Sequence, residues 1–233
     1  MKRLFFFMAA ALVMVACNKN KADEPTNPDP KPQQDTTVVT KNLIHDQFDE
    51  MLPLVGLKKS DYEAAMKKAG YEKYEGTEIY GKSTANTISE VSSLVNSSDN
   101  VYKITCSIRP FKNDSSKYEP QMTVEYVKDV IVKIGNNCEM GADKINCRFL
   151  ATYNQMGQKI CSSPSDFEKI LNAGNLNGTK TYYLDTKIEQ WNPESTAPYV
   201  GTVMNVQNAI PVQGSTATEF SVAFEFSDMT KAE

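Results

Sequence analysis

The first 41 residues constrain the fold more than any other feature, because little of this segment can join a folded core. Lys2 and Arg3 precede an uninterrupted apolar run of 13 residues, 4–16. A membrane-spanning helix needs about 20 such residues. The run instead has the length and the basic flank of a signal-peptide core. We therefore expect residues 1–16 to be a signal peptide that directs the chain to export.

The apolar run ends in Met14-Val15-Ala16-Cys17. Small residues before a cysteine resemble the lipobox of the type II signal peptide in bacterial lipoproteins of the Bacteroidetes type, although Met14 stands where leucine is usual. The resemblance implies cleavage before Cys17 and acylation of its sulfur and its new amino group. Each buried CH₂ group contributes about 0.8 kcal/mol to membrane binding, so two or three acyl chains anchor a protein firmly. We expect an outer-membrane lipoprotein that faces the periplasm or the cell surface.

A tether is predicted after the lipidated cysteine, so that 17–41 links the anchor to the folded part. Residues 18–41 contain no aromatic residue and four prolines, Pro25, Pro28, Pro30 and Pro32. Such a segment cannot bury enough apolar surface to offset the entropy lost on ordering. In an extended polyproline conformation of about 3.1 Å per residue, it would reach at most ~75 Å.

The charge balance makes nucleic acid an improbable partner. The whole chain has 25 Lys and Arg against 29 Asp and Glu, a net charge of −4. Without Lys2 and Arg3, 23 basic residues face 29 acidic ones, a net charge of −6. Nucleic-acid-binding domains carry a basic excess. The single histidine, His45, disfavours a His-rich metal site or a His-based triad, and we expect no metal and no cofactor.

Four cysteines remain beyond the anchor: Cys106, Cys138, Cys147 and Cys161. An even number in an exported chain is typical of disulfides, here two. Three pairings are possible and the sequence does not choose among them; we favour Cys138–Cys147 with Cys106–Cys161. The absence of a C-x-x-C spacing disfavours zinc and a redox pair.

Helices are predicted in two places by similar signals. Apolar residues at helical spacing over 42–55 indicate one helix, which Pro53 ends or kinks. The sequence Ser60-Asp61-Tyr62-Glu63 has the form of a capping box and predicts a second helix that ends at Gly70. A matching sequence, Ser165-Asp166-Phe167-Glu168, occurs 105 residues later and suggests a repeat.

Strands are predicted where apolar and polar residues alternate. The clearest is 220–226, with Phe220, Val222, Phe224 and Phe226 on one side. Segment 122–134 fits a strand or a helix, and its β-branched residues favour a strand. The other predicted strands are 71–82, 101–111, 145–153, 179–191 and 199–206.

These elements predict the α+β class, with antiparallel sheet and helices packed on one face. Two tandem helix-then-sheet modules would cover 42–143 and 144–233, or the two stretches form one continuous domain.

Chemical motifs are scarce. The sequence has no G-x-S-x-G, H-E-x-x-H, P-loop or G-x-G-x-x-G pattern, although a pair of carboxylates brought together only by folding remains open. An aromatic cluster is the one candidate surface: Tyr182, Tyr183, Trp191 and Tyr199. Tyr183 and Trp191 have the same parity and would share a strand face, where exposed rings can stack on sugars or anchor a protein. Packing within the core is the alternative for these rings.

We therefore expect a cell-envelope lipoprotein that binds a protein or a glycan outside the membrane without catalysing a reaction. An inhibitor or assembly factor for another envelope protein is one alternative. A hydrolase with a carboxylate site formed in space is the other.

Overall fold

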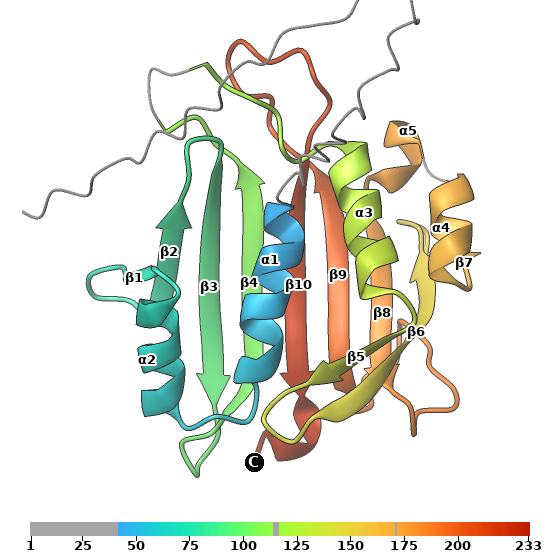
Figure 1. Cartoon of the computed structure of the whole chain (residues 1–233). Coiled ribbons are helices and arrows are strands. Elements are labelled where there is room, and N and C mark those ends of the chain that lie inside the picture. The colour runs from blue at the N-terminus through green and yellow to red at the C-terminus, as the bar shows by residue number, and fades with distance from the viewer. Residues whose placement is uncertain (1–41, 114–116, 171) are drawn as a thin grey trace, which may run out of the picture. The chain divides into compact units, whose positions relative to one another are not determined.

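A computed structural model describes residues 42–113, 117–170 and 172–233. These residues are built around one antiparallel sheet (Figure 1). The strand order is β1-β2-β3-β4-β10-β9-β8-β6-β5, with β7 paired to β6. The strands are β1 (Glu72–Lys73), β2 (Ile79–Ser83), β3 (Thr87–Val95), β4 (Val101–Pro110), β5 (Asn137–Met140), β6 (Ile145–Tyr153), β7 (Lys159–Cys161), β8 (Thr179–Asp185), β9 (Val200–Asn208) and β10 (Phe220–Asp228). The α+β class with an antiparallel sheet is confirmed.

Two helices, α1 and α3, lie side by side across the middle strands (Figure 1). Phe48 of α1 places its ring 5.4 Å from the rings of both Phe224 and Phe226 on β10. Asn42 caps α1 and also donates a hydrogen bond to Asp129 of α3 at 2.8 Å, which joins the two helices. The helices are α1 (Leu43–Met51), η1 (Leu52–Leu54), α2 (Lys59–Lys68), α3 (Val124–Ile134), α4 (Pro164–Ile170), α5 (Ala173–Leu176) and η2 (Met229–Lys231).

The two halves of the folded part share this sheet. Strand β4 of the first half pairs with the last strand of the chain, β10, and Cys106 lies opposite Phe224. The 143/144 boundary falls in the turn between β5 and β6, which pair with each other. The described residues accordingly cluster as one compact unit. One continuous sheet therefore crosses the 143/144 boundary.

The prediction of a strand at 122–134 is wrong, because residues 124–134 form helix α3. Its apolar residues at helical spacing, Val127, Val130, Ile131 and Ile134, are buried on one face of the helix. Gly135 ends the helix with a φ of 64°, a conformation that favours glycine. The β-branched residues tolerate the helix because burial of this face outweighs a small difference in propensity.

Both predicted capping boxes are wrong, although each helix exists. The N-cap of α2 is Lys58, which makes no side-chain capping bond, so Ser60 lies inside the helix. In α4, Ser163 accepts a hydrogen bond from the amide of Asp166 at 3.2 Å, two residues before the predicted cap, Ser165. Because Pro164 is suited to the first turn of a helix, the chain enters α4 earlier than the box suggests.

The predicted strands at 101–111, 145–153, 199–206 and 220–226 are confirmed as β4, β6, β9 and β10. Segment 71–82 is instead divided by a turn between β1 and β2, and 179–191 is a strand only as far as Asp185. Strands β3, β5 and β7 were not predicted, and β3 lies between β2 and β4 in the sheet.

Candidate functional site

The sheet has a second face, opposite the one that α1 covers. Side chains alternate between the faces of a strand. On β10, Phe224 and Phe226 point to α1, so Ala223 and Glu225 point the other way. We call this second side the open face.

Three of the four predicted aromatic residues meet on the open face. Residues 186–199, between β8 and β9, carry Trp191 back to Tyr182 of β8, with ring centroids 6.3 Å apart. Tyr199 follows at 5.0 Å from Trp191, with the rings at 68°. Tyr182 is 5 % exposed, whereas Trp191 and Tyr199 are half-buried. Three members of the predicted cluster therefore come together, with Tyr182 as the inner one.

The expected common face of Tyr183 and Trp191 is wrong. Tyr183 is 0 % exposed on the helix-covered side, where its ring lies 5.5 Å from that of Phe149 and its hydroxyl donates to the carbonyl of Ile131. Because β8 ends at Asp185, Trp191 does not belong to the strand and parity does not apply to it. Tyr183 is a core residue.

A hollow of about 340 Å³ lies beside these rings. Short side chains of the middle strands line it, among them Thr105, Val203 and Ala223. The aromatic residues and the loop residues Pro193 and Ser195 complete the lining. Polar groups enter from Lys180, Asn205 and Glu225. Sequence reasoning missed these three, because only strand pairing brings β8, β9 and β10 together.

Glu225 is held in place by three donors. The Tyr199 hydroxyl donates to it at 2.6 Å, the Ser227 hydroxyl at 3.3 Å, and the Lys103 ammonium lies at 2.8 Å. Burial alone would raise the pKa of Glu225, but the bonds from Lys103 and Tyr199 outweigh it and the pKa lies below its ordinary value. Burial and the bond to Glu225 raise the pKa of Tyr199. Glu225 is therefore a charged, fixed acceptor.

The predicted cysteines fall into one adjacent pair and two separate thiols. Cys138 of β5 lies directly opposite Cys147 of β6. Opposite residues of antiparallel strands have Cα atoms about 4.5–5.5 Å apart, within the range that a disulfide spans. Cys106 of β4 and Cys161 of β7 are separated by β10, β9, β8 and β6. At about 4.8 Å per strand they are ~24 Å apart, so the favoured Cys106–Cys161 pairing is wrong. All four side chains carry free thiols in this structure.

A second cavity bears on the hydrolase alternative. It measures about 90 Å³ and is lined by Asp46 and Glu50 of α1 with Tyr71 and Lys82. Glu50 pairs with Lys82 at 3.0 Å and accepts a bond from Tyr71 at 3.4 Å, and its side chain is 33 % exposed. A glycosidase acid needs a carboxyl whose pKa is raised. The described carboxyl groups with a shifted pKa all shift downward: Glu78, Asp129 and Glu225.

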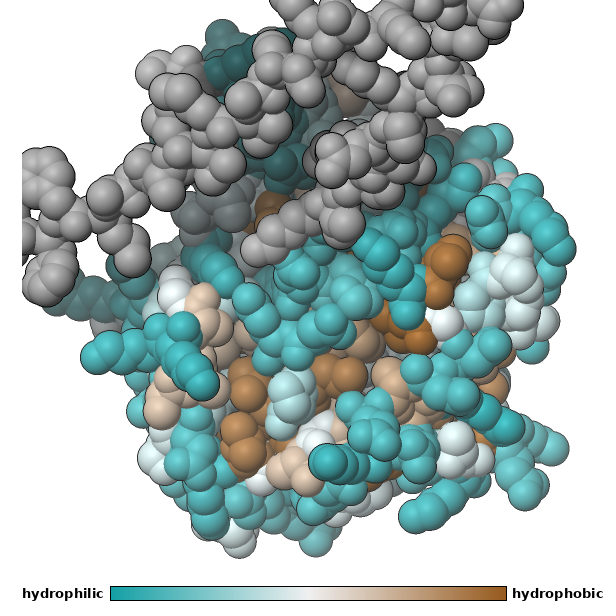
Figure 2. Space-filling view, viewed as in Figure 1, coloured by the Kyte–Doolittle hydropathy of each residue, from teal (hydrophilic) through white to brown (hydrophobic). Residues whose placement is uncertain are grey.

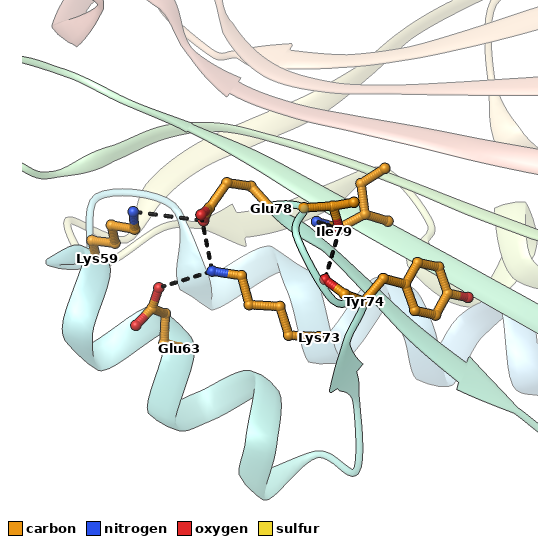
Figure 3. Close-up of polar contacts among 7 residues, drawn as sticks. Lys59, Glu63, Lys73, Tyr74, Glu78 and Ile79 are labelled. Atoms are coloured by element: carbon orange, nitrogen blue, oxygen red, sulfur yellow. Dashed lines mark hydrogen bonds and ion pairs between the residues drawn. The ribbon is translucent and has the colours of Figure 1, made fainter.

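An ion-pair network joins α2 to the turn after β1 (Figure 3). The Lys73 ammonium lies 2.9 Å from Glu78 and 3.9 Å from Glu63, and Lys59 lies 3.6 Å from Glu78. The hydrogen bond between Lys73 and Glu78 raises the pKa of Lys73 and lowers that of Glu78. Exposed pairs of this kind contribute little to stability.

The side of the molecule that carries α1 and α3 is mainly hydrophilic, with smaller hydrophobic areas among the hydrophilic residues (Figure 2).

The predicted signal peptide, Cys17 and the tether lie outside the described residues. In the described ranges, no helix is long and apolar enough to cross a bilayer. No group of three or more His, Cys, Asp and Glu side chains is placed to hold a metal ion in this part of the chain.

No family model, curated protein or solved structure matches the chain.

Proposed function

We propose that the protein is a cell-envelope lipoprotein, anchored through Cys17, whose folded domain binds a glycan in the hollow on the open face. The observation that carries the proposal is the convergence of Tyr182, Trp191 and Tyr199 with polar side chains around one hollow. The lipobox and the Pro-rich segment support the location outside the cell membrane.

The shape and chemistry of the hollow favour a glycan over a protein partner. Its volume, about 340 Å³, lies in the range of small-ligand sites, which combine apolar walls with a few placed polar groups. Aromatic rings offer flat apolar surface beside polar edges, as a sugar ring requires. Short side chains such as Thr105 and Ala223 leave room above the middle strands.

Binding without catalysis fits the state of the carboxylate in the hollow. Glu225 is already hydrogen-bonded by Tyr199 and Ser227 and paired with Lys103. A group with a lowered pKa is a poor general acid. We therefore assign Glu225 the role of orienting Tyr199 at the edge of the hollow.

The test is glycan-array binding by the full chain carrying Cys17→Ala, which lacks the proposed lipid. Trp191→Ala should weaken binding and raise Kd by about 10- to 30-fold. This increase corresponds to the loss of a buried aromatic contact worth ~1.4–2 kcal/mol. Tyr74→Ala is the control, because Tyr74 is an aromatic residue, 37 % exposed, that does not line the hollow. Trp191→Phe retains a ring if the alanine variant unfolds. Binding that is equal in wild type and both Trp191 variants would refute the assignment, and capture of a protein instead would favour the inhibitor or assembly-factor alternative.

A further inference from the structure

Resting on the proposed glycan-binding function, we infer that the hollow selects acidic sugars, those that carry a carboxylate such as uronic acids. The inference comes from which polar groups around the hollow are already partnered and which are open.

Two side chains that line the hollow have donors with no partner among the described residues. The indole nitrogen of Trp191 is buried and has no hydrogen-bond partner. An unpaired buried donor is costly and is normally satisfied by protein, water or ligand. Lys180 also lines the hollow, and within the described residues it makes no ion pair. Lys180, whose side chain is exposed, accordingly suits a ligand that supplies acceptor oxygens.

The amide of Asn205 adds a third donor next to Lys180. These two residues lie directly opposite each other on β8 and β9, so their side chains leave the same face together. The oxygen of Asn205 accepts a bond from Gln207 at 3.2 Å. Its amino group is therefore the end left for a ligand. In the same way, the Ser195 oxygen accepts the amide of Ala197 at 3.1 Å, and its hydroxyl hydrogen remains free to donate.

Glu225, the one carboxylate among the described residues that line the hollow, does not offset these donors. Glu225 pairs with Lys103 at 2.8 Å and accepts from Tyr199 at 2.6 Å and from Ser227 at 3.3 Å. Its charge is balanced by Lys103, whereas the charge of Lys180 has no counterpart at the hollow. Electrostatic complementarity then favours a ligand with a negative charge near Lys180.

The chemistry assigns each part of an acidic sugar to a region of the hollow. The carboxylate would lie by Lys180 and Asn205, where a charge-assisted hydrogen bond is stronger than a neutral one. A ring face would lie toward Trp191 and Tyr199. No bond is made or broken in this binding.

The experiment compares oligomers of galacturonic, glucuronic and sialic acid with their carboxyl-reduced forms, using the full chain with Cys17→Ala. At least one acidic oligomer should bind 10-fold or more tightly than its reduced form, with an advantage that shrinks as salt rises. Lys180→Gln should reduce this ratio to near one. Lys68→Gln, an exposed lysine on α2, is the charge-matched control and should leave the ratio unchanged.

Each outcome has a separate meaning. Equal binding of acidic and reduced oligomers, still weakened by Trp191→Ala, would overturn the acidic-sugar inference and leave glycan binding intact. An acid preference that persists in Lys180→Gln would also overturn it. Failure of every acidic and neutral glycan to bind would refute the proposed function itself. Thermal unfolding of Lys180→Gln shows whether the variant is folded.

Discussion

Replacing Phe226 by alanine tests whether the two halves of the folded part unfold together. Phe226 is fully buried on β10, with its ring 5.4 Å from Phe48 of α1 and 5.7 Å from Phe224. It also lies opposite Ile104 of β4, across the pairing that joins the halves. Truncation therefore removes contacts made by both halves.

The expected cost of Phe226→Ala follows from the burial. Phe-to-Ala changes in cores cost about 3–5 kcal/mol, through lost transfer energy and the cavity left behind. A domain of this size has a total stability of about 5–15 kcal/mol. At about 2–4 °C per kcal/mol, a loss of ~4 kcal/mol lowers Tm by roughly 8–16 °C. Phe226→Leu, which preserves most of the volume, should cost less than about 1.5 kcal/mol.

Urea unfolding followed by two signals measures this effect. Trp191, the only tryptophan, reports by fluorescence on the second half, and far-UV circular dichroism reports on the whole fold. We expect the two curves to coincide in wild type and to shift together in Phe226→Ala. If the two signals separate in wild type, or if the substitution moves only one of them, the single continuous domain is refuted.

Three further predictions concern the anchor, the carboxylate and the cysteines. Cys17→Ala should move the protein from the detergent phase to the aqueous phase on partitioning; unchanged partitioning would contradict lipid attachment. Because the pKa of Glu225 is lowered by folding, its contribution to stability is present above its unfolded pKa of about 4.3 and is lost as pH falls through the folded value. The unfolding free energy of wild type should therefore fall more steeply than that of Glu225→Gln in this acid range, and parallel curves in pH-dependent urea unfolding would count against the pairing. Peptide mapping without reduction should find Cys138 joined to Cys147 and the other two described cysteines as thiols; a different linkage would show that the strand register is incorrect.

Much of the sheet follows from local pattern. Strand β10 was predicted because large apolar residues alternate with small or polar ones, and this alternation matches a sheet with one face buried. Strand β3 was missed, since its inward residues include Thr87 and Ser89 and its apolar signal is weak. Helix α3 was mistaken for a strand because its residues satisfy both periods, and packing against α1 and the sheet decided between them.

The candidate site was only half predictable. The aromatic residues stand out in the sequence, but the face each one occupies depends on where β8 ends, and Tyr183 lies in the core while Trp191 returns over the open face. Lys180, Asn205 and Glu225 carry no motif and gain their meaning from strand pairing.

The sequence by itself determined the strongest strands of the sheet, because the alternation of apolar and polar residues acts over a few residues. It also supplied the prediction of a lipid anchor. The tertiary structure alone decided which cysteines are neighbours, that β4 pairs with β10, and which polar groups meet at the hollow. These depend on contacts between residues up to 100 or more positions apart, such as Cys106 and Phe224, whose pairing is fixed by the burial of a whole sheet face rather than by any local preference.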